Sequence, residues 1–150
     1  MALEGHDVCS LVWTKLVADA GAGGVNTLLG GTPTTPGRIY RDRVPQAAAL
    51  PAATITLVSS VDTNTLSGIR AMNTTQVDVR VVGPGASYGP LVPIATRVDT
   101  VLQGAFGTQG STYAFKLRRT DLRAFVEDDA GAAFTHVIGT YLSEAESLTS

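Results

Sequence analysis

Apolar residues recur at helical spacing in two stretches of the chain, which predicts two main helices. The first begins at Asp7 or the residue before it, with Asp7 as the N-cap, and ends at the glycines that follow Asp19. The second follows Pro90, which the first turn of a helix tolerates, and ends near Gly104. Because its opposite side is polar, this second helix is expected to lie on a sheet. A further short turn of helix is predicted at 25–29.

Alternation of apolar and polar residues marks the strands. The clearest strand runs from Thr74 to Val82, where the valines at 77, 79 and 81 face one way and Gln76, Asp78 and Arg80 face the other. This alternation predicts one face on a core and the other in water or at an interface. Further strands are predicted at 54–61, 112–118, 122–127 and 134–142, with Tyr113, Phe115 and Leu117 sharing one face of the second of these.

The segments between these elements differ in composition. Residues 30–37 contain two prolines and three glycines, which predicts a mobile surface loop. An extended arm at 37–51 leads into the first strand, and the polar stretch 62–73 predicts a long connection rather than a tight hairpin. Asp128–Gly131 predicts a hairpin turn in which Gly131 takes a positive φ. From Ser143 onward the chain is acidic and polar, and this end is expected to fray.

These elements predict an α+β fold: a mostly antiparallel β-sheet with two main α-helices packed on one face, plus an extended arm and long loops. The 150 residues suit a single domain, 1–150. Charged residues make up 16% of the chain, less than the usual quarter or so. This low charge fits a protein that covers surface with other subunits, and it fits equally well a composition rich in small residues.

Composition and charge exclude several classes of protein. The net charge of −2 gives no overall basic surface for nucleic acid, and the single cysteine, Cys9, cannot form an internal disulfide. No apolar run approaches the length of a membrane span. Glu4 and Asp7 stand where a signal peptide would carry basic residues. We therefore expect a soluble protein made in a cytoplasm, with no membrane partner.

Residues that would carry catalysis are sparse. Cys9 and His6 lie three positions apart in the first predicted helix, but a buried helix cysteine and a histidine at a helix end explain them better. His136 is interpreted as a surface or interface histidine rather than a general base. The densest group of carboxylates is 127–129, where a solvated hairpin turn is favoured over a metal site. We expect no enzyme activity and no cofactor.

Arginines occur in two clusters that each contain an aspartate, Asp42 or Asp121. Such clusters can neutralise the phosphates of DNA, but the internal acids and the acidic chain favour pairing with the carboxylates of another subunit. The candidate interface residues are Arg38, Tyr40, Arg41, Arg43, Asp78, Arg80, Arg118, Arg119, Asp128 and Asp129. The acidic partners expected on a neighbouring copy are Asp78, Glu127, Asp128, Asp129, Glu144 and Glu146.

The order of these features resembles that of the tail terminator, or tail completion, proteins of long-tailed bacteriophages (siphophages). The resemblance covers about Val8 to Leu142 and rests on order and spacing more than on one signature. Its parts are the N-terminal amphipathic helix, Arg38-Ile39-Tyr40, Val44-Pro45-Gln46, Leu50-Pro51, a strand, the strand Val77–Val81, and the helix whose apolar side is Leu91, Ile94, Val98 and Val101.

The resemblance implies a structural virion protein that forms a ring, typically of six copies. Such a ring caps the finished tail tube, ends its growth and provides the head–tail joining surface. The implied partners are further copies of the chain, the tail tube protein and neck or head-completion proteins, with DNA only passing through the lumen. The implied location is the head-proximal end of the tail, after assembly in the host cytoplasm.

Other functions are less well supported by the sequence. One is another neck or head-completion component with a similar α+β core, which the chain alone barely separates from a tail terminator. Another is a small DNA-binding packaging accessory that uses the arginine clusters. A small enzyme is disfavoured, because no catalytic triad or metal-ligand set is visible.

Overall fold

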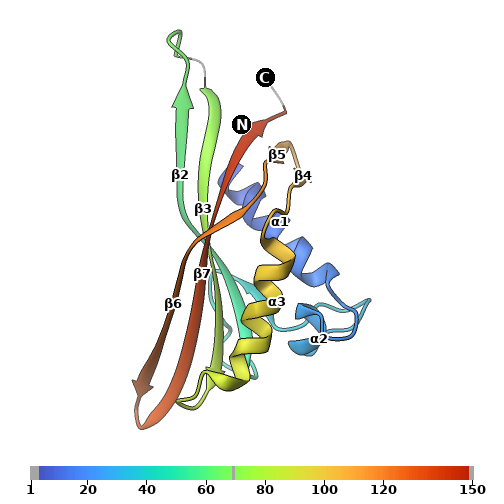
Figure 1. The fold of residues 1–150 in the computed structure, drawn as a ribbon, viewed down its shortest axis with the longest axis vertical. Coiled ribbons are helices and arrows are strands. Elements are labelled where there is room, and N and C mark those ends of the chain that lie inside the picture. Colours follow the sequence, from blue (N-terminus) through green and yellow to red (C-terminus); the bar gives the residue numbers. More distant parts are fainter. Residues whose placement is uncertain (1–3, 69, 149–150) are drawn as a thin grey trace.

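The chain folds into a curled β-sheet with helices beside it, as a computed structural model of residues 4–68 and 70–148 shows (Figure 1). The helices are α1 Glu4–Ala18, α2 Val25–Leu28, the 3-10 helix η1 Gly89–Leu91 and α3 Val92–Leu102. The strands are β1 Ile39–Arg41, β2 Ala52–Asn64, β3 Arg70–Pro84, β4 Gly107–Gln109, β5 Thr112–Ala114, β6 Arg118–Asp129 and β7 Ala132–Ser147. The predicted α+β class is confirmed.

The strand order is β1-β2-β3-β7-β5-β4, and β6 also pairs with β7. β1 runs parallel to β2, whereas the other paired strands are antiparallel, so the sheet is mixed. The long β2–β3 hairpin extends to one end of the molecule and the β6–β7 hairpin extends to the opposite end (Figure 1). The β5–β4 hairpin lies beside the C-terminal part of β7.

The core lies between one face of the sheet and the helices. On β3, Val77, Val79 and Val81 are at most 2% exposed, as their alternation predicts. The apolar sides of α1 and α3 belong to the same buried cluster. α1 packs on β2 and β3, and α3 contacts α1 and β7. We call this the helix face of the sheet and the opposite side the outer face.

The first helix begins earlier than the sequence predicts. α1 already includes Glu4, so Asp7 lies inside the helix and the N-cap prediction is wrong. The carboxylate of Asp7 instead accepts a hydrogen bond from Thr112 Oγ1 at 2.7 Å, which ties α1 to β5. A polar residue one turn from a helix end can cap it or bond to another element, and sequence spacing does not distinguish the two.

The stretch 62–73 is a hairpin rather than a long connection. β2 and β3 pair almost to the hairpin tip, with Asp62 opposite Asn73. Asn73 is 3% exposed, donates from Nδ2 to Asp62 Oδ1 at 2.8 Å and accepts from Ser60 Oγ at 2.9 Å. These side chains satisfy one another, so a polar sequence builds strands that its composition does not predict.

The predicted strand 112–118 is broken. β5 ends at Ala114, opposite Ala145, and β6 starts at Arg118, opposite Leu142. Between them Leu117 is buried, while Phe115 is 38% exposed, so these two residues do not share one face. The break occurs where Leu117 N donates to the carbonyl of residue 105 at 2.8 Å, which draws the chain towards the end of α3.

The C-terminal hairpin is longer than predicted and does not fray before its described end. Ala130 and Gly131 have φ values of +51° and +82°, which confirms the predicted turn. β7 then continues to Ser147, and Ala145 is fully buried between β3 and β5. The frayed end predicted from Ser143 is therefore wrong as far as residue 148, because two neighbouring strands pair with this segment; residues 149–150 lie outside the described part.

The loop 30–37 is anchored by a single buried side chain. Asn26, on α2, is fully buried and donates from Nδ2 to the carbonyls of Thr32 and Thr35 at 3.0 and 3.3 Å. Its Oδ1 accepts from Gly37 N at 2.6 Å. The predicted loop is present, but both of its ends are hydrogen-bonded to the body of the protein.

Candidate interaction surfaces

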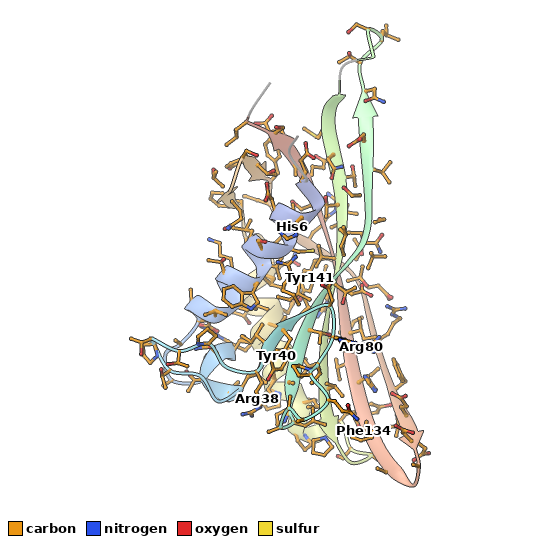
Figure 2. The ribbon with its side chains drawn as sticks, turned by 180° about the vertical axis from the view of Figure 1, so that it is seen from behind. His6, Arg38, Tyr40, Arg80, Phe134 and Tyr141 are labelled. Atoms are coloured by element: carbon orange, nitrogen blue, oxygen red, sulfur yellow. The ribbon has the colours of Figure 1, made fainter. Side chains whose placement is uncertain are left out.

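The arm places its arginines in different surroundings, and Figure 2 labels Arg38 among them. Arg38 Nε donates to the carbonyl of Pro51 at 2.8 Å. Arg41 Nη1 donates to Ser10 Oγ of α1 at 3.0 Å, and its Nη2 lies 3.5 Å from Nδ1 of His6. Arg38 and Arg41 therefore hold the arm to its own chain. Arg43 is exposed beyond the end of β1, which leaves it accessible to a partner.

Two further candidates, Asp78 and Arg80, point to the outer face from the middle of β3. Asp78 Oδ1 accepts from Thr140 Oγ1 at 2.6 Å, and its Oδ2 lies 3.3 Å from Nη2 of Arg123. The guanidinium of Arg80 lies 5.9 Å from the ring centroid of Phe125, within reach of a cation–π interaction. Both residues are thus partly engaged within the chain, through β6 and β7.

His136 is buried, which contradicts its interpretation as a surface histidine. It is 6% exposed because the Phe125 ring stacks on it, with centroids 4.7 Å apart and planes 13° apart. Its Nε2 lies 2.8 Å from Glu127 Oε2, whereas its Nδ1 is buried and has no hydrogen-bond partner. The alternation of β7 is hard to interpret in advance, since both of its faces are covered in the middle of the sheet.

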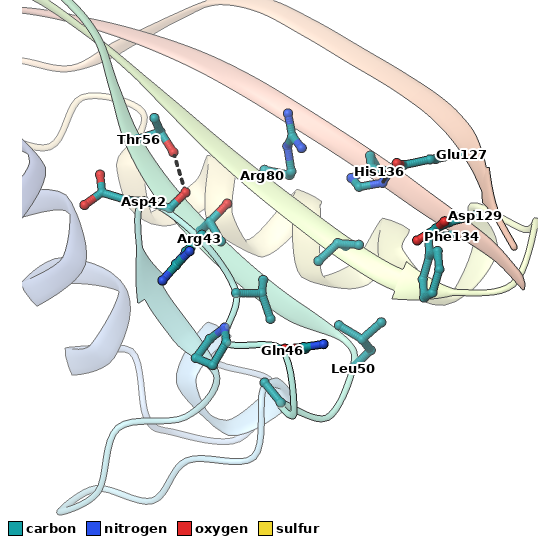
Figure 3. A pocket seen from close by; sticks show the side chains of 15 residues that line it. Asp42, Arg43, Gln46, Leu50, Thr56, Arg80, Glu127, Asp129, Phe134 and His136 are labelled. Carbon is teal, nitrogen blue, oxygen red and sulfur yellow. Dashed lines mark hydrogen bonds and ion pairs between the residues drawn. The ribbon is translucent and has the colours of Figure 1, made fainter.

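The arm and the outer face enclose an open cavity of about 720 Å³ (Figure 3). Its lining combines cationic Arg43 and Arg80 with the carboxylates of Glu127 and Asp129. Apolar side chains from the arm and the sheet complete the wall. The fold therefore brings Arg43, Arg80 and Asp129 together from segments far apart in sequence. A surface with both signs of charge suits a protein partner better than a phosphate backbone.

The remaining candidates lie elsewhere. Arg119 Nη1 lies 3.5 Å from Asp99 Oδ1 on α3, and the same oxygen accepts from the Tyr141 hydroxyl at 3.1 Å. Burial, reinforced by Asp99, raises the pKa of Tyr141 well above its ordinary value. Arg118 and Asp128 are exposed near the two ends of β6. Tyr40 is half-buried on β1.

Cys9 and the acidic residues are the groups that the sequence offers for nucleophilic or metal chemistry. Cys9 is 1% exposed, and burial raises the pKa of its thiol to about 11, so the reactive thiolate is disfavoured at neutral pH. Within residues 4–68 and 70–148, no group of three His, Cys, Asp or Glu side chains is placed to hold a metal ion. In the same part of the chain, no helix is long and apolar enough to cross a membrane.

The strand predicted at 122–127 is present as part of β6, but the sequence did not predict that its apolar residues are exposed. Every residue of β6 is exposed, including Leu122, Phe125 and Val126 at 52%, 41% and 39%. In the sequence these residues look like the core residues of an irregular strand. The signal that points to the edge of a sheet is the density of charge among them, with seven charged residues in the twelve of β6.

Comparison with known proteins shows the family of this chain. The chain matches the family model described as "Tail completion protein gp17" over residues 12–141. It shares its fold with a chain of the solved structure "Virion of native gene transfer agent (GTA) particle", with a TM-score of 0.72 and 18% identity, over 97% of this chain and 99% of that one. No curated protein matches it. The family match spans most of the sequence and confirms the resemblance, and the chain belongs to the tail completion protein gp17 family of phage tail proteins.

Proposed function

We propose that the protein forms a closed ring that caps the finished tail tube, ends its growth and provides the surface that joins the tail to the head. Membership of the tail completion family is the observation that carries this proposal, because it makes the chain a structural protein of the virion. The resemblance to tail terminators adds the ring, the six copies typical of such rings and its position between the tube and the neck.

The two sides of the molecule support such an assembly. A ring needs a head-to-tail contact, in which each copy offers two different and complementary surfaces. The arm with Arg43 lies beside β2 at one edge of the sheet, and β6 lies at the opposite edge with Asp128 and Asp129 near its end. Six of the ten candidate interface residues are exposed: Arg43, Arg80, Arg118, Arg119, Asp128 and Asp129. We retain all of these except Arg119, which pairs with Asp99 of its own chain.

DNA binding through the first arginine cluster is the weaker proposal. Arg38 donates to the Pro51 carbonyl and Arg41 to Ser10, so two of the three cations are used to hold the arm. A lumen that passes DNA without retaining it would carry little net positive charge. The outer face, where Arg80 and Arg123 alternate with Asp78 and Glu127, meets that condition.

Tube capping is tested by adding the protein to growing tubes of the phage tail tube protein. Tube lengths are measured by electron microscopy, and the mass of the protein alone is measured across a range of concentrations. We expect shorter tubes of uniform length that end in a ring. A neck component of another kind would form rings that leave tube length unchanged, and a DNA-packaging accessory would leave tubes unchanged but be retained on DNA at low salt.

A further inference from the structure

The sheet has two strand edges that no other described strand covers. β1 pairs with β2 only at residues 53–55, so the part of β2 at 58–64 has β3 on one side and no described strand on the other. β6 pairs with β7 along its whole length, and no described strand pairs with the other edge of β6. A long strand edge that no other strand covers readily pairs with a strand of another chain.

These edges lie towards opposite ends of the sheet (Figure 1), and the strand order places them on opposite sides of β3 and β7. β1 covers the other end of β2, next to residue 52, and β5 covers the C-terminal end of β7, beyond the start of β6. The edge at 58–64 therefore lies near the tip of the β2–β3 hairpin, and the β6 edge lies towards the turn of the β6–β7 hairpin. If two copies join through these edges, one copy must be displaced relative to the other along the strand direction, because the two edges lie at different heights.

We propose that residues 58–64 of one copy pair with β6 of the next copy, so that each β2–β3 hairpin extends its neighbour's sheet. This inference rests on the proposed ring and specifies its contact. The strand directions agree with it. Between the two edges the strands β2, β3, β7 and β6 alternate in direction, so a copy related by rotation about an axis roughly along the strands presents β2 antiparallel to β6.

The displacement between copies agrees with a closed barrel. The midpoint of the free edge, Val61, is level with Thr74 on β3, and the midpoint of β6, near Arg123, is level with Arg80. These levels are six residues apart on β3, or about 20 Å. Four strands span about 19 Å across the sheet. Aligning the two midpoints thus tilts the strands by about 45°, at the upper end of the range of about 35–45° found in closed barrels.

The hairpin tip and a cavity beside β6 supply a second point of contact. Leu66, at the tip, is 110% exposed. Next to the start of β6, the exposed rings of Phe106 and Phe115 line an open cavity of about 480 Å³. Tyr113 and the charged residues Lys116, Arg118 and Glu144 complete its lining. With the midpoints aligned, the tip of one copy reaches the level of this cavity on the next. Leu66 is therefore expected to lie against these aromatic rings, which would bury both exposed surfaces.

Disulfide cross-linking tests the strand pairing. Val61 is on the outer face, since it pairs with Thr74, and Asp121, Arg123 and Phe125 are on the outer face of β6. Residues directly opposite in an antiparallel pair share a face and allow a disulfide. Val61→Cys combined with cysteine at one of these three positions should give a ladder of cross-linked multimers. Val61→Cys with Ala124→Cys, which is on the helix face, should not.

A charge at the hairpin tip tests the second contact. Leu66→Lys should raise the protein concentration needed for ring formation by about tenfold or more, because it places a cation against the aromatic rings and beside Lys116 and Arg118. The matched control is Ser67→Lys, which adds the same charge to the same exposed loop and should leave the concentration within about twofold of the parent. Neither change touches the core, so circular dichroism of the monomer should be unchanged.

The outcomes separate this inference from the proposed function. Rings that form without cross-linking at any of the three outer-face positions, and that tolerate Leu66→Lys, would overturn the edge pairing while leaving the ring intact. Cross-links that appear only when tail tube protein is present, between the two chains, would show that the tube covers these edges and would also overturn it. A chain that stays monomeric with and without tubes would refute the ring itself.

Discussion

Single buried polar residues determine much of this structure. Asn26, Asn73 and Thr112 are each at most 3% exposed, and each bonds to another polar group in segments whose composition is typical of loops or surfaces. Buried polar groups are tolerated when they are hydrogen-bonded, and removing one partner leaves the other without a bond. These residues therefore stabilise the fold even though none of them belongs to the apolar core.

The loop anchor gives a prediction at this scale. Asn26→Ala removes three hydrogen bonds. It leaves the N–H of Gly37 without a partner, while the carbonyls of Thr32 and Thr35 keep their backbone donors, so we expect the free energy of unfolding to fall by about 2–3 kcal/mol in urea denaturation. Thr27→Ala, in the same short helix, removes one exposed hydrogen bond and should cost about 1 kcal/mol or less. Equal losses in the two variants would contradict the anchoring role.

The ion pair between Asp19 and Arg97 predicts acid sensitivity. Hydrogen bonds from Arg97 at 2.8 Å lower the pKa of Asp19 below its ordinary value of 3.8. A lowered pKa in the folded state stabilises the protein above pH 3.8, and this stabilisation is lost as the pH falls through the lower folded value. The free energy of unfolding of Arg97→Met should therefore approach that of the parent in acid, in denaturation curves measured at successive pH values. A constant difference at all pH values would exclude this linkage.

Among the elements, the central strand β3 separates a core face from an outer face. Val79 is 2% exposed on the helix face, while Gln76 and Asp78 are half-buried on the outer face. The same strand thus contributes to the fold through one set of side chains and to the polar outer face through the other. Its faces follow the period of two that the sequence displays.

The two faces of β3 are tested by one substitution on each. Val79→Asp places a charge in the core and should cost more than about 3 kcal/mol, enough to unfold much of the protein. Gln76→Asp, on the outer face, should leave the thermal unfolding midpoint within a few degrees of the parent. A folded Val79→Asp protein, judged by near-UV circular dichroism, would show that the faces are assigned the wrong way round.

The sequence predicts those elements whose apolar residues are periodic. Val77, Val79 and Val81 reveal β3, and the residues from Leu91 to Leu102 reveal α3, because burial on one side alone sets their pattern. The periodicity does not predict the ends of β2 and β7. They are paired through polar residues such as Asn73, or through small ones such as Ala145, whose partners lie far away in the sequence. Prediction fails here because the stabilising contact is tertiary.

The candidate surface was predicted only in part, for a related reason. An arginine cluster indicates that some of its side chains lie at an interface. It does not indicate which of the arginines bond to other residues of the same chain. Arg41 reaches back to Ser10 and Arg38 to Pro51, and both contacts depend on how the arm folds over α1 and β2. Arg43, five positions from Arg38, is exposed.

At the scale of the whole molecule, the fold offers unlike edges to its surroundings. Helices cover one face of the sheet, and the opposite face carries mixed charges. The two uncovered strand edges lie at diagonally opposite corners. A monomer leaves both edges uncovered. Repeating the chain around an axis would cover both edges at once, because each copy would pair with the next.

Assembly should depend on Arg43 more than folding does. Arg43→Glu reverses the charge of an exposed arm residue, so we expect weaker ring formation or tail docking with an unchanged monomer, measured by light scattering and thermal unfolding. Arg41→Glu should instead also lower the thermal stability, because Arg41 bonds to Ser10 of α1. Unchanged assembly of the Arg43 variant would remove the arm from the interface.

The most direct measurement is electron microscopy of purified tails that carry the protein, at a resolution that separates single β-strands. The account predicts a closed ring at the head-proximal end of the tube, in which residues 58–64 of each copy lie beside β6 of the next. Single copies scattered along the tube, or tails that are complete and joined to heads without the protein, would contradict it.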